Sequence, residues 1–221
     1  MTQVTLLDVG LLQDPALEEK VQAGLSALRR QKAQACRLEK DRLLSLGAGV
    51  ALDQALALHG LRERDLETAS GEWGKPWFSS RPDLHFNLSH SGFFAVCALS
   101  DAPVGVDMEQ VRPVREALVE RVCTPREAAL LPREAALRRD QFCRLWTLKE
   151  SVMKYFGAGL SLSPRSLEAD FGPPLVLRQE GRVQPLFFFQ WRLQGHWLTV
   201  CTQTAEPPTL RVLEKEDLKQ F

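Results

Sequence analysis

The chain has 221 residues, of which 44% are hydrophobic and 25% are charged, as in ordinary globular proteins. Its 28 basic and 28 acidic residues give a formal net charge of zero, which argues against a protein that coats nucleic acid. No uncharged apolar run approaches the length of about 20 residues that a membrane-spanning helix needs, so no membrane contact is expected.

Cysteine usage and the first residues indicate a compartment. The five cysteines form no C-x-x-C pair and lie among apolar or helical residues, as buried free thiols do. The opening MTQVTLLDVG has neither the basic segment nor the long apolar core of a secretion signal. We therefore expect a protein of the reducing cytoplasm.

Hydrophobic periodicity predicts the elements in chain order. Helices are expected near residues 15–31, 35–58, 114–121, 125–138 and 140–157. Segments rich in β-branched and aromatic residues predict strands near 4–9, 94–100, 103–109, 184–193 and 196–204. Turn residues fill 68–84, which predicts a loop, and the last eight residues predict a short helix or a frayed tail. This mixture is typical of the α+β class.

Two pairs of similar segments occur in the same order along the chain. LGAGVAL aligns with FGAGLSL at an offset of 110 residues, each at the end of a helical pattern. FFAVCALS aligns with WLTVCTQT at an offset of 104 residues, and both of these segments are typical of strands. Against a chance match of short segments, the shared order and the similar offsets favour a duplicated lobe, with a junction near residue 104.

Two acidic residues alternate on a predicted strand, PVGVDMEQV. Because successive side chains point to opposite faces of a strand, Asp107 and Glu109 share one side. Carboxylates this close repel each other unless a cation lies nearby. Free acids at a solvent-facing strand end are one interpretation. The other is a magnesium site, which needs phosphate nearby and a third oxygen ligand, such as Glu150 if its helix packs on this strand.

The segment LWTLKESVMKYFGAGL, residues 145–160, combines an apolar helical stripe with three charges. Lys149 interrupts the stripe. Glu150 and Lys154 lie four residues apart on a second face, with the glutamate first. These features fit a surface ion pair or a pair of residues in a functional site.

Two further segments place polar groups between apolar runs. GEWGKPWF holds Lys75 in a rigid turn, where its ammonium would face solvent or an anion. FNLSHSGFF holds His90 between two serines, as a turn residue or as part of a site. The other histidines lack metal-ligand spacing, and the glycine motifs of P-loop and Rossmann nucleotide sites are absent from the sequence.

Four segments in this order and spacing resemble the Sfp-type 4′-phosphopantetheinyl transferases: WGKP, FNLSHS, GVDME and WTLKESVMKYFGAGL. The strong part of the match covers about residues 74–162. The resemblance implies an α+β pseudo-dimer of two similar α/β lobes with the active site between them. It assigns coenzyme A contacts to an N-terminal lobe, 1–104, and the metal and carrier contacts to a C-terminal lobe, 105–221, in a monomeric enzyme.

The resemblance also implies the reaction and its central residues. The enzyme would move 4′-phosphopantetheine from coenzyme A to a serine of an apo acyl or peptidyl carrier protein, releasing adenosine 3′,5′-bisphosphate. Mg²⁺, or Mn²⁺ in its place, would be held by Asp107, Glu109 and Glu150, and Lys154 would bind the pyrophosphate. Glu150 is the first choice of general base. Glu127 is the second, because CTPREAALL resembles the family segment F-[ST]-x-x-E, from which its cysteine departs.

The remaining residues implied by the resemblance would bind coenzyme A. Arginines of the N-terminal lobe would add to the grip on its 3′-phosphate, with Arg42 preferred over Arg37 and Arg29. The full set is Lys75, Pro76, Ser89, His90, Arg42, Arg37, Arg29 and Lys154.

Two other functions remain open from the sequence. A magnesium-dependent hydrolase of nucleotides or pyrophosphate would use the same carboxylates without a carrier. A non-catalytic module that binds coenzyme A or carrier protein would not need to retain them. Between residues 112 and 144 there are eight arginines and no lysine against five acids, which predicts a docking surface for an acidic carrier or, alternatively, solvated helix faces.

Overall fold

A computed structural model describes residues 1–221, apart from the side chain of Leu160. The chain forms two compact units, Met1–Pro103 with Glu206–Phe221 and Val104–Ala205. The last residues therefore belong to the first unit, which corrects the predicted lobe of residues 105–221. The reason is a parallel pairing of β12, Thr209–Val212, with β1, Thr2–Asp8.

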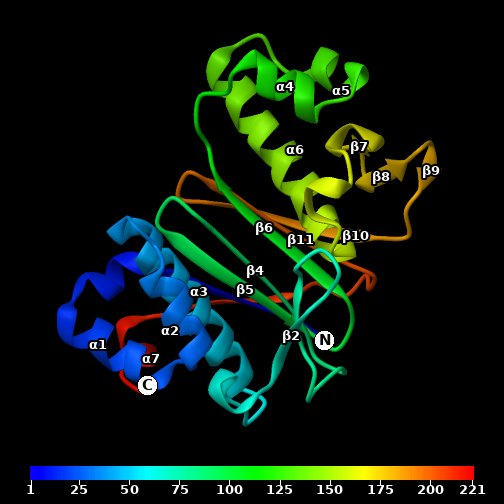
Figure 1. Ribbon diagram of the computed structural model, residues 1–221. Coiled ribbons are helices and arrows are strands. Elements are labelled where there is room, and N and C mark those ends of the chain that lie inside the picture. The colour runs from blue at the N-terminus through cyan, green and yellow to red at the C-terminus, as the bar shows by residue number, and fades with distance from the viewer. The chain divides into compact units, whose positions relative to one another are not determined.

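The first unit is a four-stranded sheet covered by a long helix (Figure 1). Its strands lie in the order β12-β1-β5-β4, and α3, Glu39–Ala57, packs on them. Here β4 is His85–Ser91 and β5 is Phe94–Ser100. The other elements are η1 (Val9–Gln13), α1 (Pro15–Gly24), α2 (Ala27–Gln34), η2 (Glu63–Asp65), β2 (Thr68–Ser70), β3 (Pro76–Phe78) and α7 (Lys215–Leu218).

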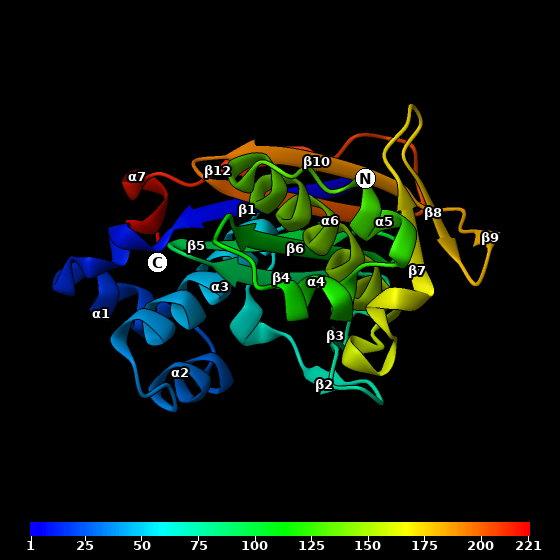
Figure 2. The same ribbon diagram turned by 90° about the horizontal axis from the view of Figure 1, so that it is seen from above.

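The second unit is a three-stranded sheet with its own long helix, α6, Ala135–Phe156. Its strands lie in the order β10 (Phe187–Leu193), β11 (His196–Thr202) and β6 (Val104–Gln110). Figure 2 shows the small sheet β7-β8-β9 at one end of this unit. The other elements are α4 (Glu116–Val122), α5 (Pro125–Leu130), η3 (Gly159–Ser161), η4 (Pro164–Ser166), β7 (Leu167–Asp170), β8 (Val176–Gln179) and β9 (Arg182–Val183).

Helix boundaries follow local caps and breakers. The predicted helix of residues 15–31 is two helices, because the Ser26 hydroxyl accepts the amide of Arg29 and begins α2. The predicted boundary between the helices at 125–138 and 140–157 is also wrong. Pro132 ends the first at Leu130, and the second runs continuously from Ala135. The left-handed Gly157, with φ of 70°, ends α6.

The interpretation of His90 as a turn residue and the prediction of a loop throughout residues 68–84 are both wrong. The polar segment FNLSHS lies in the regular strand β4, because it pairs antiparallel with β5 along its whole length. The hairpin of β2 and β3 lies within the segment predicted to be a loop. In the part of the chain that the structure describes, no helix has the length and apolar character needed to cross a membrane.

The two units share one topology. Each has a strand, then a long helix, then an antiparallel hairpin whose second strand becomes the centre of the sheet. The aligned segments FFAVCALS and WLTVCTQT supply these central strands, β5 and β11. The other alignment does not hold, since LGAGVAL lies inside α3 whereas FGAGLSL follows the end of α6.

Close approach of α6 to its sheet requires a glycine. A Cβ atom on Gly105 would lie 2.0 Å from the carbonyl oxygen of Ser151 and 2.5 Å from the amide nitrogen of Tyr155. Both are backbone atoms, which cannot swing aside. The helix axis therefore passes over β6 at a distance that a strand residue with a side chain does not permit.

We predict that Gly105→Ala lowers the free energy of unfolding of the second unit by about 3 kcal/mol, because overpacking here meets backbone. Gly172→Ala is the matched control, since its nearest neighbour would be 3.6 Å away. Denaturant titration of both variants measures the difference. Equal stabilities for the two would show that α6 tolerates a side chain at the crossing.

Candidate functional site

The strand β6 presents its two carboxylates on the face that α6 covers. Gly105, Asp107 and Glu109 follow each other at intervals of two residues along the strand, so all three positions share that face. The adjacent strand β11 places Thr199 opposite Asp107 and Trp197 opposite Glu109. The sequence prediction that both carboxylates point to one side agrees with this register.

The helix α6 brings charged residues to those carboxylates. The Lys154 ammonium donates a hydrogen bond to Asp107 Oδ1 at 2.7 Å, and the Asp107 side chain is only 5% exposed. One turn earlier, Glu150 is partly buried on the same helix face. Two neutral contacts hold the helix to the sheet, Cys143 Sγ to the backbone oxygen of Glu109 and the hydroxyl of Thr147 to that of Thr199.

Electrostatics within this cluster favours a cation. Burial raises the pKa of the Glu150 carboxyl to about 7, with repulsion by Asp107 and Glu109 adding to the rise and attraction by Lys154 opposing it. Among the described residues, no three Asp, Glu, His or Cys side chains converge closely enough to hold a metal ion. By chemistry alone, these carboxylate oxygens are donors of the kind that a hard divalent cation prefers, and such a cation would take its other ligands from water and phosphate.

Glu127, the second candidate for the general base, is held inside the unit. Its Oε2 accepts hydrogen bonds from the Lys149 ammonium at 2.5 Å and from the Thr124 amide at 2.7 Å. Its Oε1 accepts the amide of Ala169 at 2.8 Å. Burial lowers the pKa of Lys149, whereas attraction by Glu127 opposes that change. The Glu127 carboxylate is thus engaged at both oxygens.

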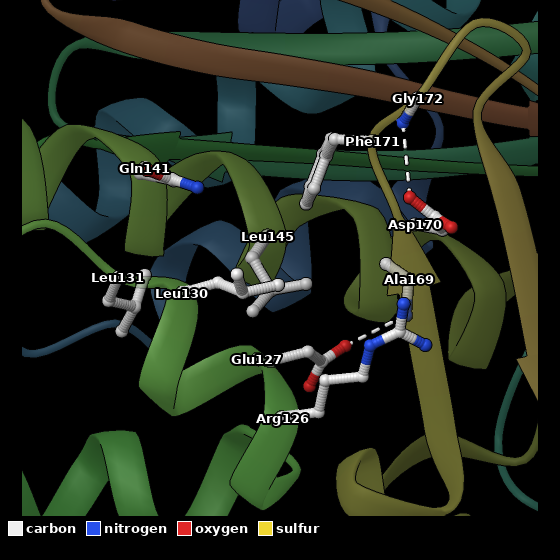
Figure 3. Close-up of a pocket in the computed structure, with 10 residues that line it drawn as sticks. All are labelled: Arg126, Glu127, Leu130, Leu131, Gln141, Leu145, Ala169, Asp170, Phe171 and Gly172. Carbon is white, nitrogen blue, oxygen red and sulfur yellow. Dashed lines mark hydrogen bonds between the residues drawn. The ribbon is translucent and has the colours of Figure 1, made fainter.

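A pocket of about 230 Å³ lies against Glu127 (Figure 3). The figure shows the bond from Ala169 to Glu127 at one wall, and the apolar side chains of Leu131, Leu145 and Phe171 around the space. None of the carboxylates on β6 or Glu150 lines it. A second pocket, of about 220 Å³, borders Glu109 itself.

Apart from Lys154 on α6, the residues predicted to contact coenzyme A belong to the first unit. Lys75 and Pro76 lie at the β2–β3 hairpin, where Gly74 has a left-handed φ of 81° that the turn requires. Ser89 and His90 lie next to each other on β4, with Ser89 buried and His90 exposed. Pro76, Ser89 and His90 thus lie in strands, and Lys75 lies in the turn just before β3.

The three arginines predicted for the 3′-phosphate have different surroundings. Arg29 forms a buried ion pair with Glu63 at 3.2 Å, and their side chains are 12% and 6% exposed. Its aliphatic stem packs over Gly49, where a Cβ would lie 2.6 Å from Arg29 Cγ. Arg42 forms an ion pair with Glu18. Arg37, between α2 and α3, is exposed.

Two residues that shape this site carried only weak signals in the sequence. A glycine inside the predicted strand PVGVDMEQV indicates close backbone approach, and Gly105 makes one. A lysine inside an apolar stripe indicates a buried ion pair, and Lys149 forms one. Neither signal names the partner.

Comparisons with known proteins agree with this arrangement. The family model of the 4′-phosphopantetheinyl transferase superfamily matches residues 103–202, which covers β6, α6 and β11. The 4′-phosphopantetheinyl transferase Sfp of Bacillus subtilis (strain 168) is 31% identical, over 95% of this chain and 98% of that protein. The 4′-phosphopantetheinyl transferase ffp of Bacillus subtilis is 28% identical, over 90% and 93%. The 4′-phosphopantetheinyl transferase psf-1 of Bacillus pumilus is 41% identical, over 59% and 58%.

The superfamily match and the carboxylate-bearing α+β unit define the class of protein, a transferase of phosphopantetheine. Near-complete alignment with Sfp narrows the class, and the chain belongs to the Sfp-type 4′-phosphopantetheinyl transferases. As an enzyme of this family it uses coenzyme A as substrate and transfers phosphopantetheine to carrier proteins.

We predict that Arg29→Met lowers the free energy of unfolding by about 3 kcal/mol, because it leaves the buried Glu63 carboxylate without its cation. The exposed Arg37→Met should change it by less than about 0.5 kcal/mol. Denaturant titration of both variants compares them. A stable Arg29→Met protein would show that this arginine is not structural.

Proposed function

We propose that this enzyme transfers 4′-phosphopantetheine from coenzyme A to a serine hydroxyl of an apo acyl or peptidyl carrier protein, in a magnesium-dependent reaction that releases adenosine 3′,5′-bisphosphate. The observation that carries the proposal is the cluster of Asp107 and Glu150 around Lys154, with Glu109 on the same strand face. A serine oxygen must attack a pyrophosphate that repels nucleophiles by its own negative charge, so the site has to supply positive charge.

We assign the cation to Asp107, Glu109 and Glu150, with Mg²⁺ as the natural ion and Mn²⁺ as a substitute. Their mutual repulsion supports the assignment, because a divalent cation relieves it. A bound cation would neutralise phosphate charge and polarise the phosphorus under attack.

The protein's own groups divide the remaining tasks. Lys154, held near Asp107 by an ion pair, supplies an ammonium for the pyrophosphate. Glu150 accepts the proton of the attacking serine, because Glu127 has both oxygens engaged in buried hydrogen bonds. The leaving oxygen departs on adenosine 3′,5′-bisphosphate.

We assign the adenosine end of coenzyme A to the first unit. Lys75 and Pro76 on the hairpin and Ser89 and His90 on β4 would contact it. For the 3′-phosphate we now prefer Arg37 to Arg42, the choice made from the sequence, since Arg37 is exposed whereas Arg29 and Arg42 are paired with glutamates. Because one chain already repeats the topology, the enzyme would act as a monomer.

The surroundings of Glu109 favour a macromolecular acceptor over hydrolysis by water. The adjoining pocket of about 220 Å³ is largely apolar, with Val114, Leu118 and Trp146 in its walls. Leu118 is 40% exposed. Arg112, also in the wall, donates to the amide oxygen of Gln110 rather than to a carboxylate. An apolar pocket edged by arginine suits an acidic protein surface with an apolar side chain beside its serine.

We predict that Asp107→Asn and Glu109→Gln each lower the rate of transfer by about 100-fold or more, because each removes charge from the proposed cation site. The assay is intact-mass spectrometry of an apo carrier incubated with coenzyme A, with Mg²⁺ or with a chelator. Near wild-type transfer by either variant, or undiminished transfer in the chelator, would refute the metal assignment. Adenosine 3′,5′-bisphosphate formed without carrier would identify a hydrolase instead.

We predict that charge reversal at Arg112 or Arg115 raises the KM for carrier by roughly 3- to 10-fold and leaves that for coenzyme A unchanged. Arg182→Glu, an exposed arginine on β9, is the control. Added salt should weaken the wild-type reaction, since exposed charges are screened beyond about 8 Å at physiological ionic strength. An unchanged KM for carrier in both variants would place docking elsewhere.

A further inference from the structure

Lys149 is a buried lysine on α6 that directly precedes Glu150. Its side chain is 0% exposed. Its ammonium donates to the backbone oxygens of Val122 at 2.8 Å and Pro164 at 3.0 Å, and to Glu127 Oε2 at 2.5 Å. These acceptors belong to the end of α4, to η4 and to α5, so one side chain connects α6 to three other segments.

Glu127 extends this connection to further backbone. As the third residue of α5 it forms a capping box with Thr124, in which each side chain accepts the other's backbone amide. Its second oxygen accepts the amide of Ala169 on β7, the bond visible in Figure 3. The pair therefore joins α6, α5 and β7 through hydrogen bonds with defined directions.

Stability alone does not account for a buried lysine and glutamate at this place. Removing two charges from water is expensive, and apolar residues of similar volume are often equally stable or more stable. Hydrogen bonds fix the orientation of the groups that they join, which apolar packing does not do. Buried ionic groups can specify one arrangement among several that apolar contacts would allow.

The orientation of α6 decides where its functional groups point. Successive residues of a helix are about 100° apart around its axis, so the direction of Lys149 sets the direction of Glu150. On the sheet side, the contact of Gly105 with Ser151 and Tyr155 sets the distance of the helix from β6. On the opposite side, Lys149 makes its three hydrogen bonds, whose defined directions oppose rotation of the helix about that contact.

We propose that Lys149 and Glu127 are positioning residues, whose buried pair fixes the rotation of α6 and so directs Glu150 and Lys154 toward Asp107 and Glu109. The proposal rests on the function proposed above for those four residues. It also gives Glu127 a role other than general base.

The test compares two variants of the full chain that alter neighbouring buried positions of α6. Lys149→Met keeps the length of the side chain and removes its hydrogen bonds. Leu148→Ala, also 0% exposed, weakens the apolar core without touching the pair. Each variant is measured for thermal unfolding, for kcat and KM in carrier transfer, and for affinity for Mn²⁺ alone by water-proton relaxation, at a temperature where it is folded.

We expect Lys149→Met to lower kcat and Mn²⁺ affinity by about tenfold or more, as loss of supporting contacts around a metal site does, with KM for carrier nearly unchanged. Leu148→Ala should lower the unfolding temperature and leave the other quantities near wild type. If folded Lys149→Met retains wild-type kcat and Mn²⁺ affinity, or if Leu148→Ala loses both equally, the positioning role is wrong.

A variant that does not fold and a wild-type protein without transfer activity still leave the proposal testable. If Lys149→Met does not fold, Glu127→Gln replaces it under the same criteria, since it keeps the volume of the side chain and removes its charge. If wild-type protein transfers nothing to any carrier, the proposed function fails. The Mn²⁺ affinities then still decide whether the buried pair positions the carboxylates.

Discussion

The close crossing of α6 over β6 is the constraint on which the functional unit depends. Because Gly105 has no side chain, backbone atoms of Ser151 and Tyr155 come directly against the strand. The carboxylates two and four residues further along β6 then lie within reach of the helix, and Lys154 bonds to Asp107 at 2.7 Å. A crossing held apart by even one methyl group would move these charges apart, and their attraction falls as the distance between them grows.

The first unit has the same topology, but the glycine at its close helix–sheet contact lies in a different element. There the glycine is on the helix, and a Cβ on Gly47 would meet the side chains of Val9 at 2.5 Å and Ala95 at 3.1 Å. Those neighbours are apolar and belong to one hydrophobic cluster with Leu7. One unit therefore has apolar residues at its helix–sheet crossing, and the other has charged ones. A shared topology does not determine chemistry; the side chains at the crossing do.

The periodicity of the sequence correctly predicted which side chains share one face of a strand or of a helix. The alternation of β6 placed Asp107 and Glu109 on one side, and the 3.6-residue period of α6 placed Glu150 and Lys154 together. Pairings between distant segments were not predictable in this way. The β4 segment is polar and becomes a strand only because β5 pairs with it, and β12 joins β1 from the far end of the chain. Likewise, the apolar stripe showed that Lys149 faces inward but could not identify Glu127, 22 residues earlier, as its partner.

The concentration of like charges also explains why the site has structural supports on two sides. Partly buried Glu150 lies near two other carboxylates, and its pKa rises to about 7, so the folded unit holds these groups in an arrangement that costs stability. Such an arrangement persists only when surrounding contacts over-determine it. Here the backbone contact at Gly105 acts from the sheet side and the three hydrogen bonds of Lys149 act from the other. In the proposed reaction, a bound cation and the pyrophosphate would replace the repulsion among these carboxylates by attraction. Substrate binding would therefore stabilise the folded unit, which this repulsion destabilises when the site is free.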